Sequence, residues 1–359
     1  MITEKQFRKE YSRCNKCKVP VCELHCPAGV CIPALLQFYE YGLDKAIEYA
    51  YKINPFQEIC GYLCSDKYCI SSCVKNNTDG FPINIRTIHK YLGEHFCLDY
   101  DKLITNDYPN KSVIVIGSGV TGLTIAWLLA NLGIKVDIFE QSLTEIGGKL
   151  NLIPETRLPK DVLERTLAII KNHPNITITN NLSITDIEAF KQEQSIPVFE
   201  AIGTPFRKNL DIEGSSLTID YRDYLPNPNI SEKDNIAIIG GGNVAVDCAL
   251  ISRYKGAKTT MFVRRNFFDM KIEEKYLKEL FDNSVNIVNN FVPNKITLNF
   301  NDMSLCGDCF GNNVEIKGFT KIVLAIGDKD SQGKPQTIVE CVAKAKEMVN
   351  EYLRDLENA

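Results

Sequence analysis

The N-terminal part of the chain carries cysteines whose spacing suits metal binding. One group has the pattern C-x2-C-x4-C-x3-C-P and a second has C-x4-C-x3-C; they comprise Cys14, Cys17, Cys22 and Cys26, then Cys64, Cys69 and Cys73. Short cysteine runs that end in C-x3-C-P occur in two-cluster ferredoxins, where the last cysteine of a run binds the other cluster. Structural zinc sites commonly use two C-x2-C pairs, and among these seven cysteines only Cys14 and Cys17 have that spacing. The pattern therefore favours iron–sulfur clusters over zinc.

Two cubane clusters need eight ligands, so these cysteines leave one position open. The candidates for it are Cys31, Cys60 and His89. Between the two cysteine groups, residues 32–56 have apolar residues at helical spacing, with a glycine in the middle and a proline near the end. We expect a helical hairpin that brings the two cysteine groups together.

Composition and charge exclude several classes of partner. The chain has 359 residues with a net charge of −4 and no basic run, so nucleic acid is not an expected partner. Residues 1–13 are charged throughout and lack the apolar core of a secretory signal, which predicts a cytoplasmic location. Cytosolic thiols stay reduced, so the 14 cysteines are not expected to form a disulfide framework. Polar residues interrupt the apolar residues 112–139, so no membrane span is expected.

Residues 111–140 have the pattern of a dinucleotide-binding unit. They read as a strand, a glycine-rich turn, an amphipathic helix and a second strand, and the turn contains Gly117, Ser118, Gly119 and Gly122. The glycines allow a pyrophosphate to approach the N-terminus of the helix, where unpaired N–H groups favour anions. Glu140, 23 residues after Gly117, is placed to accept hydrogen bonds from a ribose hydroxyl. This predicts a bound dinucleotide, and the acid suits the adenosine ribose of FAD.

A second unit of the same kind begins at residue 235. Its turn contains Gly240, Gly241, Gly242, Asn243 and Val244, and Ala245 takes the third glycine position. The second strand ends in Arg264 and Arg265 where the first unit has an acid. Paired guanidinium groups bind a 2′-phosphate bidentately, which favours NADPH over NADH. The alternative is that the two arginines form a solvated strand end.

The expected fold is α/β with an α-helical N-terminal domain. Residues 320–353 read as a buried strand, a turn at Gly327 and Asp328, and a helix from about Thr337, which should complete the first nucleotide domain. The predicted domains are a two-cluster iron–sulfur domain at 1–108, an FAD domain at 109–205 and 319–359, and an NADPH domain at 206–318.

At this level the chain resembles the NADPH-dependent, FAD-containing iron–sulfur oxidoreductases typified by the glutamate synthase small subunit. The N-terminal part of dihydropyrimidine dehydrogenase and the large subunit of NADH-dependent ferredoxin:NADP oxidoreductase are built similarly. The resemblance covers nearly the whole chain. It rests on "CNKCKVPVCELHCP", "NPFQEICGYLCSDKYCISSC" with "FPINIRTIHKY", "IGSGVTG", "IGGKLNLIPETRLPKDV", "IGGGNVAVDCA" with "VRR", and "AIGD".

The resemblance implies how two [4Fe-4S] clusters would be held. One cluster would use Cys14, Cys17, Cys22 and Cys73, and the other would use Cys26, Cys64 and Cys69. The eighth ligand in the family is a glutamine or glutamate, and the matching position here is His89, which can ligate iron through a ring nitrogen. Cys60 is the alternative ligand, although it also resembles a family cysteine that does not ligate.

The resemblance also implies nucleotide contacts outside the two turns. Gly148, Leu150 and Arg157 match FAD-contacting positions, as do Gly327 and Asp328, and Lys271 joins the NADPH site. One departure concerns the C-terminal part. The family has two late motifs, an "AxG" strand and a later "AGD" strand, whereas this chain has a single "LAIGD". The resemblance therefore gives one matching motif, instead of two, for the nicotinamide contacts and the floor of the flavin site.

The function implied is electron input. NADPH would reduce FAD, and electrons would pass singly through the clusters to a partner protein, such as a subunit resembling the large subunit of glutamate synthase or another oxidoreductase. No catalytic acid or base is required of the protein, because the cofactors carry this chemistry. One alternative is a stand-alone flavin disulfide reductase that uses Cys306 and Cys309. Another is a non-catalytic nucleotide-binding zinc module.

Overall fold

The computed structural model describes residues 1–97, 99–203, 207–270, 272–328 and 337–358. The chain forms two compact units. The first consists of Met1–Asn151, Glu155–Gly203 and Gln336–Ala359, and the second of Leu152–Pro154 and Thr204–Pro335. The first unit thus contains both the cysteine-rich region and the first glycine-rich turn, and the second unit contains the second turn.

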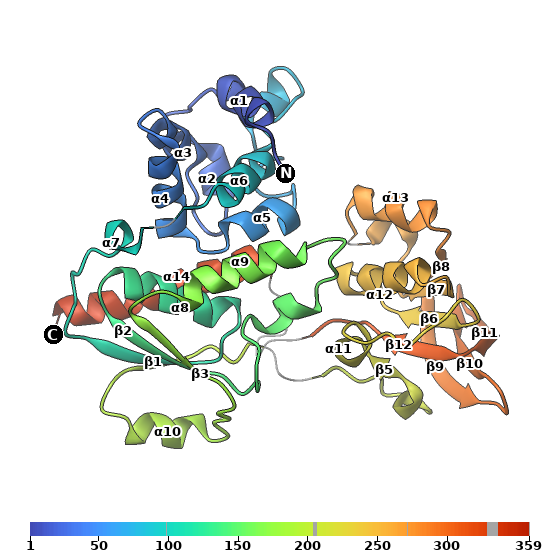
Figure 1. Ribbon diagram of the computed structural model, residues 1–359. Helices are drawn as coiled ribbons and strands as arrows, with labels where there is room; N and C mark the ends of the chain where they lie inside the picture. Colours follow the sequence, from blue (N-terminus) through green and yellow to red (C-terminus); the bar gives the residue numbers. More distant parts are fainter. Residues whose placement is uncertain (98, 204–206, 271, 329–336, 359) are drawn as a thin grey trace. The chain divides into compact units, whose positions relative to one another are not determined.

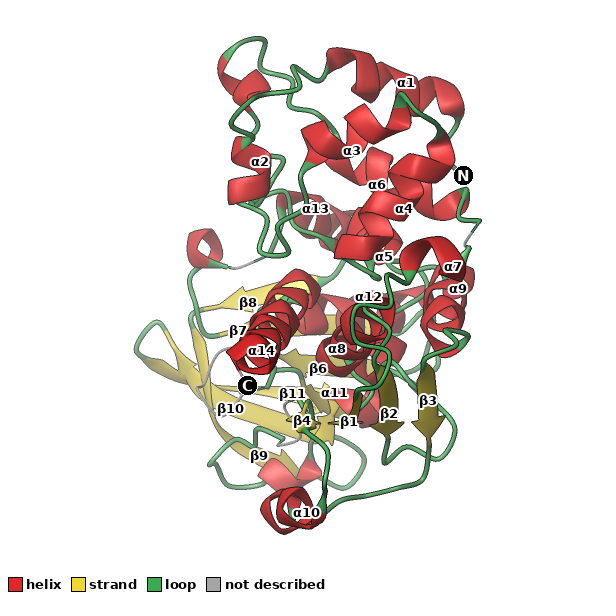
Figure 2. Ribbon diagram, turned by 90° about the vertical axis from the view of Figure 1, so that its left-hand side faces the viewer, coloured by secondary structure: helices red, strands yellow, loops and turns green. Residues whose placement is uncertain are grey.

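Helices are the only regular elements among the described residues of the N-terminal region of the first unit, and loops connect them (Figure 2). Its elements are α1 (Glu4–Arg13), α2 (Val21–Leu24), α3 (Ile32–Tyr39), α4 (Leu43–Ile53), α5 (Gln57–Leu63), η1 (Val74–Asn77), α6 (Ile85–Glu94) and α7 (Tyr100–Leu103). Helices α3 and α4 pack together as a hairpin, which confirms the helical hairpin expected over residues 32–56. The core of this helical region is formed by fully buried apolar side chains such as Phe7, Leu35 and Ile59. Most of the cysteines lie at the ends of these helices or on the segments between them, whereas Cys22 lies in α2 and Cys60 in α5.

The first nucleotide-binding region is a parallel sheet with the strand order β3-β2-β1-β4. Its strands are β1 (Ser112–Ile116), β2 (Lys135–Phe139), β3 (Ile176–Thr179) and β4 (Val198–Glu200). Its helical elements are α8 (Val120–Asn131), η2 (Gly148–Leu152), α9 (Lys160–Lys171), α10 (Ile187–Glu193) and α14 (Ile338–Asn358). Helix α14 packs against α8, so the C-terminal helix returns to this region as expected (Figure 1). This strand order is that of a Rossmann half.

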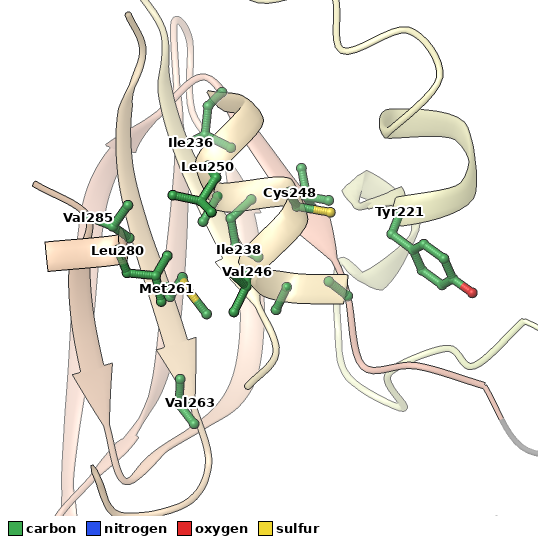
Figure 3. Close-up of a cluster of buried hydrophobic side chains, with 14 of the residues drawn as sticks. Tyr221, Ile236, Ile238, Val246, Cys248, Leu250, Met261, Val263, Leu280 and Val285 are labelled. Carbon is green, nitrogen blue, oxygen red and sulfur yellow. The ribbon is translucent and has the colours of Figure 1, made fainter. Parts of the chain in front are cut away.

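The second unit repeats the arrangement. Its parallel sheet has the order β5-β12-β6-β7-β8, from β5 (Ile219–Asp220), β6 (Asn235–Ile239), β7 (Lys258–Val263), β8 (Asn286–Asn289) and β12 (Lys321–Leu324). Its helical elements are η3 (Ser215–Leu217), α11 (Tyr221–Tyr224), α12 (Asn243–Tyr254), η4 (Phe267–Asp269) and α13 (Glu274–Asp282). In Figure 3, Val246 and Leu250 of α12 lie in one buried cluster with Ile238 and Met261 of the sheet. Apolar strands suit a parallel sheet, which is covered on both faces.

An antiparallel meander connects β8 to β12. It consists of β9 (Phe291–Leu298), β10 (Met303–Cys309) and β11 (Asn312–Phe319), in the order β11-β10-β9. Buried side chains of the meander, including Phe291 and Leu305, share a core with Phe262 of β7. The meander therefore belongs to the second unit.

The strand of the "LAIGD" motif differs from the expectation. Residues 319–359 were expected to complete the FAD domain, but β12 pairs in parallel with β6 and β5 of the second sheet, so only α14 returns to the first unit. The physical reason is an internal repeat. β4 and the residues "AIG" at 201–203 border β1, and β12 and the residues "AIG" at 325–327 border β6. Each sheet uses one such strand beside its glycine-rich turn.

Among the helices in the described ranges, none has both the length and the apolar character needed to cross a bilayer.

Candidate functional site

The first glycine-rich turn is shaped by close backbone approaches. Gly117 has φ 100°, and a Cβ atom added there would lie 2.6 Å from the carbonyl oxygen of Ala201. A Cβ added at Gly122 would lie 1.9 Å from the carbonyl oxygen of Gly117. Both positions therefore admit only glycine, because any side chain would push β1, α8 and the segment after β4 apart.

Gly119 differs from Gly117 and Gly122 because it faces open space. No protein atom lies within 4 Å of a Cβ added at this position, which is the N-cap of α8. The first N–H groups of a helix have no partner within it and attract anions. An open cradle at a helix N-terminus fits the pyrophosphate of a dinucleotide, so the residues present suit FAD.

Glu140 lies at the same turn. The side chain is buried, and its Oε2 accepts hydrogen bonds from the backbone N–H of Ser118 (2.8 Å) and from the Ser118 hydroxyl (2.5 Å). Its Oε1 accepts from the backbone N–H of Ser142 at 2.8 Å. Tertiary contacts thus hold the carboxylate beside the loop, where the sequence placed a ribose acceptor.

The segment after Glu140 also approaches this turn. The backbone N–H of Gly147 donates to the carbonyl of Ser118 at 2.8 Å, and a Cβ added at Gly148 would lie 3.3 Å from the Cα of Gly119. Leu150 is buried in the following turn of 3-10 helix. Arg157 lies farther along in the same unit and is partly buried. The structure therefore brings Gly148 and Leu150 to the first turn.

The second turn repeats this geometry. A Cβ added at Gly240 would lie 2.2 Å from the carbonyl oxygen of Ala325, whereas Gly242, the N-cap of α12, again faces open space. Helix α12 starts at Asn243 and Val244, and Ala245 is buried. An open N-cap in this sheet gives a second anion cradle.

Arg264 and Arg265 lie beside the second turn. A Cβ added at Gly241 would be 2.5 Å from Cγ1 of Val263, the last residue of β7, and the two arginines follow it directly. Both arginines are exposed, and the described residues place no carboxylate within ion-pair distance of them. Lys271, expected at this site, lies outside the described residues.

Gly327 and Asp328 lie in the second unit and not in the first. The Tyr221 hydroxyl donates a hydrogen bond to the Asp328 carboxylate, and the Arg222 guanidinium forms an ion pair with it. The expectation that they complete the FAD domain is therefore corrected, because the strand that carries them joined the second sheet. Tyr221 and Arg222 were missed at the sequence level, since nothing near them in the chain marks a carboxylate partner.

Three cysteines of the first group and one of the second border a common pocket. Cys14, Cys17, Cys22 and Cys73 all line it, together with apolar side chains that include Ile32. Burial, reinforced by the neighbouring Cys14 thiol, raises the pKa of Cys22 to about 12. Bound cations would reverse this shift, since a coordinated thiol is deprotonated. The pocket gathers the four cysteines that the resemblance assigns to one cluster.

The cysteines assigned to the other cluster, Cys26, Cys64 and Cys69, lie in the same unit. Burial raises the pKa of Cys69, and the neighbouring Cys64 and Cys26 thiols raise it further, so the three sulfurs lie within electrostatic reach of one another. Cys60 is buried one helical turn before Cys64 and shares a hydrogen bond with it. Within the described residues, no group of three or more metal-ligating side chains converges on a single ion. A cluster of four irons and four sulfides is larger than an ion, so its ligands border a space instead of meeting at a point.

His89 is buried on α6, and its Nδ1 is hydrogen-bonded to the side-chain amide of Gln57, which is also buried. Burial lowers the pKa of His89 to about 4, so its imidazole is neutral at pH 7. Gln57 and Cys60 lie one turn apart on α5. The two candidates for the eighth ligand therefore occupy neighbouring positions.

Cys306 and Cys309 lie on the single strand β10. Residues three apart in a strand are separated by about 10 Å, and a disulfide needs Cα atoms within about 7 Å. Both residues are free cysteines. The structure thus contradicts the alternative of a redox disulfide at this pair.

Family models match three parts of the chain. Residues 1–99 match the model described as dihydropyrimidine dehydrogenase domain II, 4Fe-4S cluster. Residues 115–176 match an NAD(P)-binding Rossmann-like domain, and residues 235–304 match pyridine nucleotide-disulphide oxidoreductase. Each match coincides with one of the regions built above.

Curated relatives align along most of the chain. The glutamate synthase (NADPH) small chain of Azospirillum brasilense is 25% identical over 94% of this chain and 72% of its own length. That of Escherichia coli is 26% identical over 97% of this chain and 75% of its own. The NAD-dependent dihydropyrimidine dehydrogenase subunit PreT of Escherichia coli is 27% identical over 89% of this chain and 79% of its own.

Solved structures share the fold. Thioredoxin reductase of Lactococcus lactis has a TM-score of 0.56 at 17% identity, covering 70% of this chain and 100% of its own. A 2-naphthoyl-CoA reductase has a TM-score of 0.56 at 19% identity, covering 79% of this chain and 46% of its own. At these identities the likeness concerns the fold alone.

The fold, the two turns and the family matches define the chain as an oxidoreductase that joins an iron–sulfur domain to FAD- and NAD(P)-binding domains. Within this class, the chain is a homologue of the glutamate synthase small chains.

Proposed function

We propose that the chain is an electron-input subunit that takes electrons from NADPH through FAD and two [4Fe-4S] clusters to a partner protein. The observation that carries this proposal is the pocket lined by Cys14, Cys17, Cys22 and Cys73. Cys73 is far from the other three in sequence, yet the fold returns it to them. The first turn, which suits FAD, lies in the same compact unit.

Bound NADPH and FAD supply hydride transfer, and iron–sulfur clusters accept electrons one at a time. The chain itself binds and orients these groups. The open N-caps at Gly119 and Gly242 receive the pyrophosphates of FAD and NADPH, respectively. Glu140 accepts a hydrogen bond from the adenosine ribose of FAD. Arg264 and Arg265, both exposed beside the second turn, hold the 2′-phosphate that distinguishes NADPH from NADH.

We assign the first cluster to the pocket cysteines and the second to Cys26, Cys64, Cys69 and His89. A neutral imidazole has a ring nitrogen with a free lone pair, and His89 is buried and neutral. Exchanging the amide oxygen and nitrogen of Gln57 would let His89 Nδ1–H donate to the amide oxygen and direct Nε2 to iron. The amide oxygen of Gln57 has no other partner in the described part of the chain.

Cys60 is the alternative eighth ligand, favoured by its direct contact with Cys64. Replacing each candidate separately decides between them. His89→Ala should change the spectrum of the second cluster, whereas Cys60→Ala should leave it unchanged. The reverse result would assign Cys60.

The partner we propose is an oxidoreductase that accepts single electrons, such as a protein resembling the large subunit of glutamate synthase. The support is the similarity to small chains of that enzyme. The glutamate synthase small chains and the dihydropyrimidine dehydrogenase subunit PreT are both named as parts of larger enzymes. Anaerobic isolation from the native extract, followed by identification of what copurifies, tests this part.

The central experiment is anaerobic reconstitution followed by metal and flavin analysis. We expect about eight irons, about eight acid-labile sulfides and one flavin per chain, all reducible by NADPH. Cys69→Ser should lose about four irons while NADPH still reduces the flavin, and the exposed Cys97→Ser should be normal. Two zinc ions and no iron would support the zinc-binding module instead.

A further inference from the structure

Helix α14 brings one lysine to the turn that follows Cys26. The Lys346 ammonium donates a hydrogen bond to the backbone carbonyl of Ala28 at 2.5 Å. It also lies 3.9 Å from a Cβ added at Gly29, in the turn that follows Cys26. All of these residues are in the first unit. The sequence gives no sign of this contact, because Lys346 lies at the opposite end of the chain.

This lysine carries a charge without a counter-ion. Among the described residues, no carboxylate lies within ion-pair distance of Lys346, although its side chain is partly buried. Burial lowers the pKa of Lys346, and the nearby Cys26 sulfur and Glu23 carboxylate act against this shift. Removing an ammonium from water without a partner costs free energy, so an anionic group next to this position would compensate.

Burial raises the pKa of the Cys26 thiol, and backbone hydrogen bonds in the turn next to Lys346 oppose this rise. Backbone N–H groups of Ala28, Gly29 and Val30 hydrogen-bond to the Cys26 sulfur. Lys346 adds a positive charge at the same turn. Hydrogen bonds and charges around the sulfurs are among the factors that set the potential of an iron–sulfur cluster.

Helix α14 also contacts the flavin region. Cys341, little more than one turn before Lys346, shares a hydrogen bond with Thr121 in the first turn of α8. One rigid helix therefore touches both the start of the FAD-binding helix and the turn that carries Cys26.

We propose that Lys346 supplies a positive charge that raises the reduction potential of the cluster held by Cys26, Cys64 and Cys69. The inference rests on the proposed function. In the step concerned, reduced flavin gives up one electron and the cluster becomes more negative by one unit. A fixed positive charge nearby stabilises the product more than the reactant.

The effect can be bounded from Coulomb's law. With an effective dielectric constant near 20, a unit charge about 12 Å away changes the equilibrium constant for one-electron reduction by about tenfold, which is about 59 mV, and a closer charge has a larger effect. Lys346→Gln should therefore lower the midpoint potential of the second cluster by about this amount. Lys346→Arg keeps the charge and should stay near the wild type.

The experiment is a redox titration of the anaerobically reconstituted holoprotein, followed by electron paramagnetic resonance. Lys344→Gln is the matched control, because Lys344 is exposed on the same helix. We expect a shift of the second cluster in Lys346→Gln, no shift in Lys346→Arg or Lys344→Gln, and an unchanged first cluster.

Three outcomes would overturn the proposal. An unshifted potential in Lys346→Gln with full iron content would show that the charge does not act on the cluster. An equal shift in Lys344→Gln would show a general charge effect. Loss of the second cluster from Lys346→Gln would show that Lys346 serves assembly by holding the turn. Failure of the proposed function is distinguishable, because it would appear in the wild type as missing iron or flavin.

Discussion

Replacing Gly119 by alanine separates the nucleotide cradle from the fold. The backbone of Gly119 has φ −72° and ψ −178°, which alanine adopts without strain, and no protein atom lies within 4 Å of the added Cβ. The flavin-free protein should therefore keep its stability within about 1 kcal/mol, with a small gain if the unfolded chain is stiffened.

Binding of FAD should respond differently. The methyl group would occupy the open space at the N-terminus of α8 that we assign to the pyrophosphate. Moving an anion away from these N–H groups weakens charge-assisted hydrogen bonds worth about 1.5–3 kcal/mol each. Loss of one such bond corresponds to a flavin affinity about 10- to 100-fold weaker.

Gly122→Ala provides the contrast. Its Cβ would lie 1.9 Å from the carbonyl oxygen of Gly117, so this variant should destabilise the first unit even without flavin. The assay pairs thermal unfolding of the flavin-free protein with a flavin titration followed by fluorescence quenching. Wild-type flavin affinity in Gly119→Ala, or a loss of flavin-free stability equal to that of Gly122→Ala, would refute the assignment of the cradle.

Further perturbations test the charges of the molecule. The fully buried Glu58 pairs with Arg165 at 2.5 and 3.1 Å, so Arg165→Met should cost the first unit about 3 kcal/mol in unfolding free energy, measured with denaturant. Changing Arg264 and Arg265 together to alanine should weaken NADPH about 30-fold and NADH less than threefold in binding titrations. Burial lowers the pKa of His173 to about 4, whereas the same histidine in the unfolded chain has its ordinary pKa of about 6.5. As the pH drops below 6.5 the unfolded chain therefore takes up a proton before the folded protein does. The free energy of unfolding should fall by about 2 kcal/mol at pH 5.

Each of these has a control. Adding Glu58→Gln to Arg165→Met should restore part of the loss, because the buried charge is removed; no restoration would mean that the pair is not the cause. Equal weakening of NADPH and NADH would discard the 2′-phosphate role of the arginines. In His173→Gln the pH-dependent loss should shrink by the stated amount, and an unchanged pH profile would contradict the assignment to this histidine.

The cofactor classes could be predicted from the sequence because their signals are local. A strand, a glycine-rich turn and a helix are consecutive in the chain, and the fit at Gly117 and Gly122 depends on backbone only a few residues away. The cysteine spacing is also local to each short run, although Cys26 of the first run lies with Cys64 and Cys69 of the second. Assigning Cys73 to the first run required the resemblance, since spacing alone leaves its partners open.

Only the tertiary structure showed which distant segments of the chain pair with one another. The strand at Lys321–Leu324 is apolar enough for the interior of either sheet, and it joined the second because the Ala325 carbonyl fits against Gly240 there. The same applies to Asp328 with Arg222 and to Lys346 with the turn after Cys26. The sequence determined what the chain binds, through motifs whose geometry is set by neighbouring residues. Which residues share each site depended on how distant segments pack together. Several segments are apolar enough to pair with either sheet, and only the close steric fit of the folded chain selects one pairing.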